Sequence, residues 1–152
     1  MRRSVLVLGL TLSAAAAGAQ DRPWIARLQA GSATIHRWGR SGGWILAQVG
    51  RSFDGRISAD LGLTASGSDE GYGSLTAGLE LLPFPRAIVS PFARGEVGVL
   101  GEPEYGGCVA SLGGGIAVRV NDRISFRAGA TWNVHGGVRG PVVYYGGIEQ
   151  RW

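Results

Sequence analysis

The segment from Ala110 to Val134 alternates between apolar and small or polar residues, and this pattern constrains the fold more than any other feature. Successive side chains of a β-strand point to opposite faces, so a period of two predicts strands with one apolar face. The joint Asn121-Asp122-Arg123 is short and consists of turn-forming residues, which predicts a β-hairpin. The residues expected on the apolar face are Ala110, Leu112, Gly114, Ile116, Val118 and Val120, followed by Ile124, Phe126, Ala128, Ala130, Trp132 and Val134. We call the set of alternate residues that share one face a parity.

The two-residue period recurs along the chain and predicts eight strands. They are expected at residues 24–33, 44–53, 57–65, 74–81, 88–100, 110–120, 124–134 and 142–152. An even number of strands, each about 9–11 residues long, is typical of a closed barrel that crosses a membrane. Arg51 is the one charged residue on the otherwise apolar parity, which indicates a bulge or a position at the membrane interface.

The first twenty residues have a different composition from the rest of the chain. Arg2-Arg3 precede an apolar run from Val5 to Ala17, and small residues end the run at Ala17-Gly18-Ala19. A basic start, an apolar stretch and a small-x-small site are typical of a secretory signal peptide. A stretch of about thirteen apolar residues is too short to span a bilayer comfortably. We therefore predict a cleaved signal peptide at residues 1–19 and an exported barrel domain at residues 20–152.

The composition excludes several classes of function. The fifteen basic residues are all arginine and are scattered among eleven acidic residues, so no basic face for nucleic acid is expected. Cys108 is the single cysteine, which excludes an intramolecular disulfide. The 27 glycines are spread through the alternating segments, where they suit the bends and close approaches of a strongly curved sheet.

The connections between the predicted strands alternate in length. Those after the second, fourth and sixth strands are short, whereas the others are longer, polar and rich in glycine. Short periplasmic turns and longer outer loops are typical of bacterial outer-membrane barrels. The outer segments carry charges that are either solvated or meet lipopolysaccharide phosphates and divalent cations. These charged residues are Arg37, Arg40 and Arg139, and Asp69, Glu70, Glu102 and Glu104.

Aromatic residues gather near the predicted strand ends, which also indicates a membrane barrel. Two aromatic girdles about one membrane thickness apart are expected for a spanning barrel. With the N-terminus on the periplasmic side, the lower girdle is predicted to contain Trp24, Phe53, Phe84, Phe92, Phe126 and Trp152. The upper girdle is predicted to contain Trp44, Tyr72, Tyr105, Trp132 and Tyr144.

The parity opposite the apolar one carries charges of both signs. They are Arg27, Arg94, Arg119, Arg127 and Arg151, and Asp60, Glu80, Glu96 and Glu149. Inside a barrel these charges nearly cancel, whereas unpaired buried charges would be costly. An eight-stranded interior is only wide enough for its own side chains. We therefore predict a structural charge network in the interior, with neither a pore nor an active site.

The chain resembles the small eight-stranded outer-membrane barrels of the outer membrane protein A transmembrane domain and its outer membrane protein X relatives. The resembling segments are residues 90–98 (SPFARGEVG), 112–119 (LGGGIAVR) and 121–127 (NDRISFR), together with the terminal aromatic Trp152. The resemblance implies an all-β, antiparallel, up-and-down transmembrane barrel in the bacterial outer membrane. It also implies contact with membrane lipid and lipopolysaccharide, and recognition of the C-terminal strand by the barrel-assembly machinery.

These observations favour a structural or surface role, in envelope integrity or adhesion, with no catalysis and no cofactor. Two alternatives stay open. The first is a lipid A-modifying enzyme, although His135 at the predicted outer rim is followed by glycines and has no serine nearby. The second is a soluble lipocalin-like barrel with its apolar face inward around a ligand. His36, His135 and Cys108 do not make a conventional zinc site by themselves.

Overall fold

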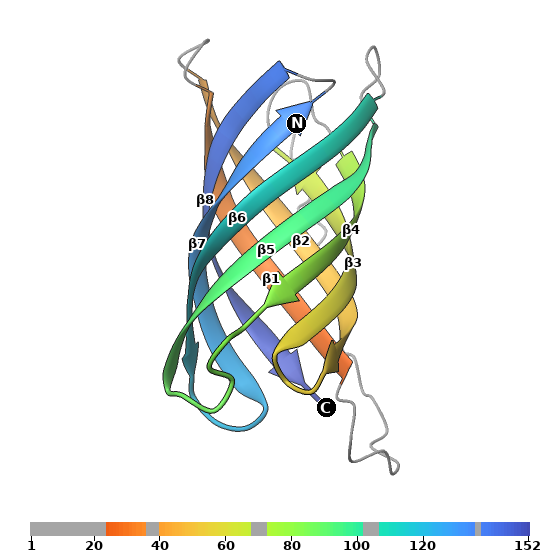
Figure 1. The fold of residues 1–152 in the computed structure, drawn as a ribbon. Helices are drawn as coiled ribbons and strands as arrows, with labels where there is room; N and C mark the ends of the chain where they lie inside the picture. Colours follow the sequence, from red (N-terminus) through yellow and green to blue (C-terminus); the bar gives the residue numbers. More distant parts are fainter. Residues whose placement is uncertain (1–23, 36–39, 68–72, 102–106, 136–137) are drawn as a thin grey trace, which may run out of the picture.

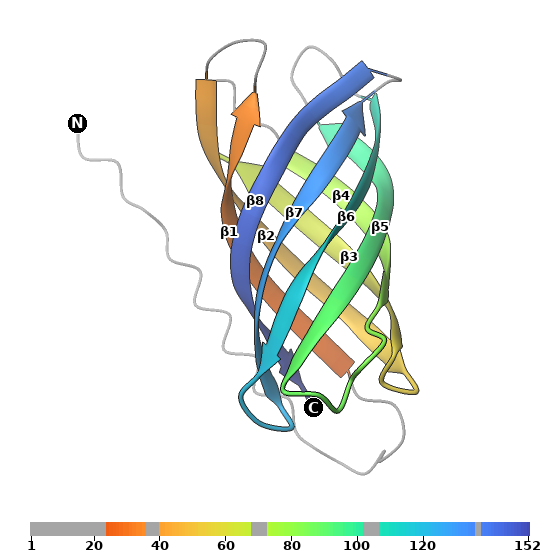
Figure 2. The same ribbon diagram turned by 60° about the vertical axis from the view of Figure 1, so that its left-hand side comes forward.

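The computed structural model of the protein describes residues 24–35, 40–67, 73–101, 107–135 and 138–152. Each strand pairs antiparallel with its neighbours in the chain, and the last strand pairs with the first, which closes a barrel (Figures 1 and 2). The strands are β1 (Trp24–Ile35), β2 (Arg40–Phe53), β3 (Ile57–Ser66), β4 (Gly73–Leu81), β5 (Val89–Gly101), β6 (Gly107–Arg119), β7 (Ile124–His135) and β8 (Val138–Arg151). The predicted eight-stranded up-and-down barrel is confirmed.

The predicted signal peptide, residues 1–19, lies outside the described residues. In the part of the chain that the structure describes, no helix is both long and apolar enough to cross a membrane.

Several strands extend further toward the loop end than the side-chain alternation predicts. β2 begins at Arg40 instead of Trp44, and β8 begins at Val138 instead of Val142. The pairing of Ser32 with Gly43 continues without interruption to that of Ile35 with Arg40. Ladder hydrogen bonds join backbone groups, so pairing continues into glycine and serine stretches where no apolar face marks a strand.

The strand register gives the barrel its tilt. Beginning at Trp24 and following each paired residue around the barrel, the path returns to β1 at Thr34, ten residues further along the strand. A stagger of this kind requires the strands to be inclined to the barrel axis, as Figure 1 shows. An eight-stranded barrel has a narrow interior that side chains can fill completely.

The apolar side chains face outward and the charged ones face inward. Leu61, at 58% exposure, and Leu112, at 67%, lie on the outer surface, whereas Arg27, Glu80 and Glu149 are buried inside. A lipocalin-like soluble barrel would need the opposite arrangement. An apolar belt that surrounds the whole barrel instead matches a lipid environment.

The three described connections all lie at the same end as the C-terminus (Figure 1), and those between β2 and β3 and between β6 and β7 are tight, whereas the one between β4 and β5 spans residues 82–88. In the β2–β3 turn, which spans residues 54–56, Asp54 and Gly55 both have positive φ, as the two central residues of a type I′ turn do. The Asp54 carboxylate accepts hydrogen bonds from the backbone N–H groups of Arg56 and Ile57. In the β6–β7 turn, the side-chain oxygen of Asn121 accepts two backbone hydrogen bonds in the same way. We call this the turn end, and the opposite one the loop end.

The outward face predicts a depth-dependent penalty for charge. Leu61 lies halfway along β3, and Ile57 lies on the same face at the turn end of that strand. In lipid vesicles, Leu61→Arg is expected to lower the free energy of unfolding by about 2–4 kcal/mol, and the control Ile57→Arg by only about 0–1 kcal/mol. Urea titration followed by tryptophan fluorescence measures both changes. Equal losses for the two variants would contradict a membrane-spanning orientation.

Candidate functional site

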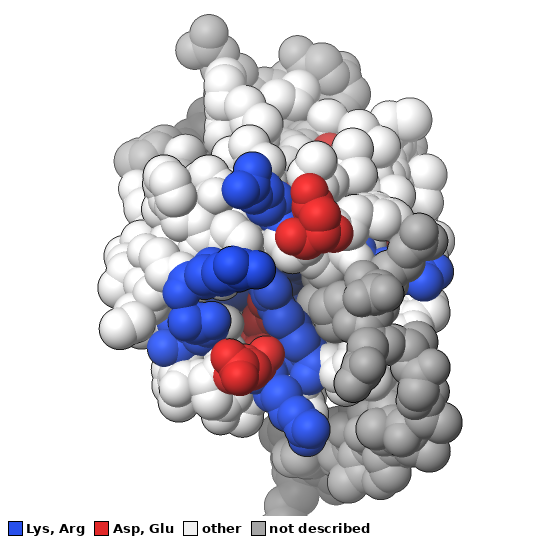
Figure 3. Space-filling model, turned by 60° about the horizontal axis from the view of Figure 1, so that its bottom comes forward, with Lys and Arg blue, Asp and Glu red and all other residues white. Residues whose placement is uncertain are grey.

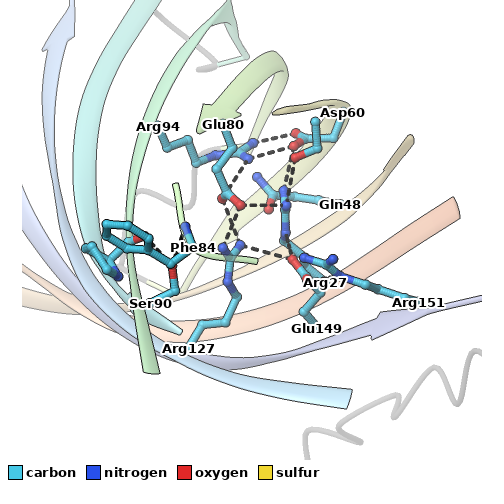
Figure 4. A network of polar contacts seen from close by, with 12 residues as sticks. Arg27, Gln48, Asp60, Glu80, Phe84, Ser90, Arg94, Arg127, Glu149 and Arg151 are labelled. Atoms are coloured by element: carbon cyan, nitrogen blue, oxygen red, sulfur yellow. Dashed lines mark hydrogen bonds and ion pairs between the residues drawn. The ribbon is translucent and has the colours of Figure 1, made fainter. Parts of the chain in front are cut away.

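The centre of the barrel is occupied by the guanidinium group of Arg27, which β1 directs inward (Figure 4). Its nitrogens donate to Asp60 of β3 at 2.7 Å, Glu80 of β4 at 2.9 Å and Glu149 of β8 at 2.6 Å. A further hydrogen bond reaches the Ser58 hydroxyl at 3.0 Å. One arginine therefore links three carboxylates from three strands.

Three further arginines complete the set of ion pairs. Arg94 of β5 binds both carboxylate oxygens of Asp60 and also the carboxylate of Glu96. Arg127 of β7 donates to both oxygens of Glu80, at 2.7 and 2.5 Å, and lies 3.2 Å from Glu149. Arg151 of β8 donates to Glu149 at 2.8 Å.

We define the central network as these four arginines and four carboxylates: Arg27, Arg94, Arg127, Arg151, Asp60, Glu80, Glu96 and Glu149. Its formal charges cancel. β2 joins it through Gln48, whose amide donates to Glu96 at 3.0 Å, and β6 joins it through Ser111, whose hydroxyl donates to Glu96 at 3.4 Å. Every strand of the barrel therefore contributes at least one side chain.

The central network is almost completely shielded from solvent. The side chains of Arg27, Asp60, Arg127 and Glu149 are each 1% exposed. Charges taken out of water lose several kcal/mol of solvation each, and only close pairing with additional hydrogen bonds offsets that loss. The arrangement is therefore stable as a complete set and sensitive to the loss of any single member.

Gly78 leaves space for the central network, and the aromatic ring of Phe92 packs against it. A Cβ atom on Gly78 would lie 2.4 Å from Arg94 Nη2 and 3.0 Å from Asp60 Oδ1, so any side chain at this position would have to displace members of the network. The Phe92 ring packs inside the barrel with the Arg127 guanidinium carbon 4.2 Å from its centroid, a cation–π contact. The prediction that Phe92 belongs to the lower girdle is therefore wrong.

Arg119 lies apart from the central network, although its parity predicted it there. Its guanidinium donates to the Arg86 carbonyl at 2.6 Å and lies 3.7 Å from the Asp122 carboxylate. It comes from the last residue of β6, where the barrel opens to solvent. The alternation of side chains tells which face of a strand a residue lies on, but not how high the residue lies along the barrel axis. Arg119 shares its face with the other charges but lies at a different height.

The outward aromatic residues lie near both ends of the barrel. At the turn end, Trp24, Phe53, Phe84 and Phe126 are exposed, and Trp152 is half-buried. At the loop end, Trp132 and Tyr144 are exposed. Tyr72 and Tyr105 lie outside the described residues.

Trp44 does not belong to the upper girdle as predicted. It is 8% exposed and packs inside the barrel against Tyr145 in an edge-to-face contact, with ring centroids 6.0 Å apart. Ile45 next to it faces outward, so strand alternation directs the Trp44 ring inward. Its position near a strand end suggested a girdle, but its parity places it in the core.

Two small cavities flank the central network. The loop-end cavity, about 60 Å³, is lined by Trp44, Thr76, Tyr145 and other side chains, and the turn-end cavity, about 70 Å³, by Ser90, Arg119 and others. The Trp44 indole N–H and the Thr76 hydroxyl are buried without a hydrogen-bond partner among the described residues. A cavity lined by both apolar side chains and unpaired polar groups has room for bound water beside those groups. Between the two cavities, the central network fills the cross-section.

The described residues contain no group of three or more His, Cys, Asp or Glu side chains that could hold a metal ion. Cys108 is exposed and free. His36 lies outside the described residues, and so do Arg37, Asp69, Glu70, Glu102 and Glu104. The side chains of His135, Arg40 and Arg139 also lie outside the description, so the lipid A-modifying alternative concerns a region that the structure does not describe.

No protein-family model and no curated protein matches the chain. Solved structures do match. Neisserial surface protein A is 11% identical, with a TM-score of 0.66 over 86% of this chain and 97% of that one. Ail, the attachment invasion locus protein of Yersinia pestis, is 14% identical, with a TM-score of 0.55 over 88% of this chain and 100% of that one. A designed transmembrane β-barrel matches at 10% identity and a TM-score of 0.56, over 84% of this chain and 95% of that one.

The chain therefore has the fold of the small eight-stranded outer-membrane β-barrels, and the predicted resemblance is confirmed at the level of the fold. Identities this low carry no further information about function.

The burial of the central network predicts a large effect of removing one carboxylate. Glu80→Gln leaves Arg27 and Arg127 with excess positive charge in a dry interior, so the free energy of unfolding is expected to fall by about 3–5 kcal/mol. Urea titration of the vesicle-inserted barrel measures the change. The exposed control Asp122→Asn is expected to have no measurable effect. A loss from Glu80→Gln no larger than that from the control would show that the network does not stabilise the fold.

The tight fit at Gly78 predicts a steric effect that does not depend on charge. Gly78→Ala inserts a methyl group against Arg94 and is expected to destabilise the barrel by about 1–3 kcal/mol through overpacking. In the control Gly43→Ala, the added Cβ has no neighbouring atom within 4 Å. Unfolding curves of the two variants in the same vesicles give the comparison. A Gly78→Ala barrel as stable as the control would indicate that the network shifts to accommodate the methyl group.

Proposed function

We propose that this protein is an integral outer-membrane barrel with a sealed interior, which serves the envelope as a structural or surface-exposed element without catalysis. The observation that carries the proposal is the central network, which joins all eight strands across the middle of the barrel. A barrel built to conduct solutes needs an open cross-section, and one built for catalysis needs an accessible group. The buried ion pairs leave neither in the interior that the structure describes.

The outer-membrane location is supported by the outer surface. The apolar belt and the exposed aromatic residues at both ends match the hydrocarbon layer and its two interfaces. Neisserial surface protein A and Ail have the same fold. In this proposal the signal peptide directs export, and the C-terminal strand ending at Trp152 is the segment that the barrel-assembly machinery recognises. The loop end then meets lipopolysaccharide and the cell exterior.

The proposal is tested by location and by conductance. Cells that produce the full chain are fractionated, and the outer-membrane fraction is compared with and without boiling on a detergent gel. A mobility shift on boiling is expected from a folded barrel. The purified barrel in planar bilayers is expected to give no conductance above that of the protein-free membrane.

Recovery of the chain in a soluble fraction without a mobility shift would overturn the membrane location. Stable channel openings from the folded barrel would overturn the sealed interior while leaving the location intact. The two parts of the proposal therefore fail separately.

A further inference from the structure

Five arginines surround the turn end of the barrel, of which Arg56, Arg86 and Arg123 are exposed and Arg51 and Arg119 are half-buried. Each connection at this end contributes one, namely Arg56 between β2 and β3, Arg86 between β4 and β5, and Arg123 between β6 and β7. Two more, Arg51 and Arg119, lie at the neighbouring strand ends. Figure 3 shows basic side chains gathered around this mouth of the barrel, with fewer acidic ones between them. We call these five residues the turn-end arginines.

The acidic side chains at this end do not balance the turn-end arginines. Asp54 and Asp122 are the acidic residues of the described turns, and the carboxylate of Asp54 is engaged by the backbone of its own turn. Asp122 lies 3.7 Å from Arg119 and is otherwise exposed. The central network is neutral by itself, so five arginines and two aspartates give the described turn end a side-chain charge of about +3.

The turn-end arginines lie at the level of an aromatic girdle. Trp24, Phe53, Phe84 and Phe126 are exposed at the same end, and such residues mark the layer of lipid headgroups. Arg56, Arg86 and Arg123 lie within three residues of Phe53, Phe84 and Phe126 along the chain, so their guanidinium groups lie within reach of lipid phosphates. A guanidinium group matches a phosphate through two parallel hydrogen bonds.

Arg51 provides an independent observation. It lies on the lipid-facing parity of β2, where its neighbours across the ladder are Trp24 of β1 and Ala59 of β3. Its Nε–H is buried and has no hydrogen-bond partner among the described residues. Arg51 as a whole is half-buried, and no described residue pairs with its guanidinium, so the accessible part of that group can bind an anionic group from the membrane side.

The two ends of the barrel differ in charge. The segments at the loop end contain Arg37, Arg40 and Arg139 together with Asp69, Glu70, Glu102 and Glu104, a balance of one negative charge. Among the described residues outside the central network, the excess positive charge lies at the turn end. This asymmetry favours one orientation in a membrane whose turn-side leaflet is anionic.

We propose that the turn-end arginines form a binding belt for the phosphate groups of anionic phospholipids in the leaflet on the turn side. The belt holds several lipids around the barrel and fixes its height and orientation. The inference rests on the proposed membrane location, and it adds a ligand class and a side of the membrane to that location.

The test uses the full barrel in a neutral detergent, with folding first verified by the mobility shift on boiling. Phosphatidylglycerol and phosphatidylcholine are titrated in separate samples at low salt, and native mass spectrometry counts the bound lipids. The wild-type barrel is expected to retain phosphatidylglycerol more tightly, and this preference is expected to weaken steeply as salt is raised. Equal retention of the two lipids at low salt would overturn the proposal without any variant.

The combined variant Arg56→Gln, Arg86→Gln and Arg123→Gln removes one arginine from each turn. Each substitution is expected to weaken phosphatidylglycerol binding about fivefold, on the order of a hundredfold for the three together. The matched control Arg37→Gln, Arg40→Gln and Arg139→Gln removes the same charge at the loop end and is expected to bind as the wild type does.

Three results would contradict the belt. A control that loses as much affinity as the turn variant would mean that net charge alone drives binding. Competition by millimolar inorganic phosphate would indicate a site for small anions instead of phospholipids. A wild-type barrel that binds neither lipid but still shifts on boiling would overturn the belt and leave the proposed location standing, whereas absence of the shift would overturn the location itself.

Discussion

The rest of the structure depends on charge neutrality in the dry interior of the barrel. Because lipid covers the outside, the polar residues of each strand must face inward, where they cannot keep their water. Arg27 shows the solution, since its guanidinium reaches carboxylates from three other strands at hydrogen-bond distance. The core of this protein is therefore held by ion pairs where a soluble domain of this size would use packed aliphatic side chains. Apolar contacts inside are left to a few residues such as Trp44, Leu46 and Tyr145 near the loop end.

The same network separates the two mouths of the barrel chemically. On the loop side lies a small cavity lined by both apolar and polar side chains, and on the turn side the interior opens toward a rim rich in arginine. A structure of this kind allows each end to take a different role. The buried ion pairs lie in the middle of the barrel, and the excess of described arginines lies at the turn end.

Most of the fold could be predicted from the sequence, because alternation fixes which side chains share a face. It correctly placed Arg27, Glu80 and Glu149 inside and Leu61 and Leu112 outside. It could not give the height of a residue along the barrel axis, which depends on the stagger between strands. That is why Arg119 was expected among the central charges although it lies at the mouth. Trp44 and Phe92 were misplaced for a different reason, since proximity to a strand end was given more weight than parity. The linking roles of Gln48 and Ser111 depend on the same register and carry no signal in the sequence.

The separation of the network partners along the chain has a consequence for assembly. The contact between Arg27 and Glu149 joins residues 122 positions apart, from the first strand and the last. A partly formed sheet therefore cannot complete its ion pairs, and its inward face keeps hydrated charges until β8 meets β1. Such an open sheet would have to bring water or bare charge into the hydrocarbon layer. The last strand thus supplies the remaining carboxylate partner of Arg27, so closure of the barrel completes the central network.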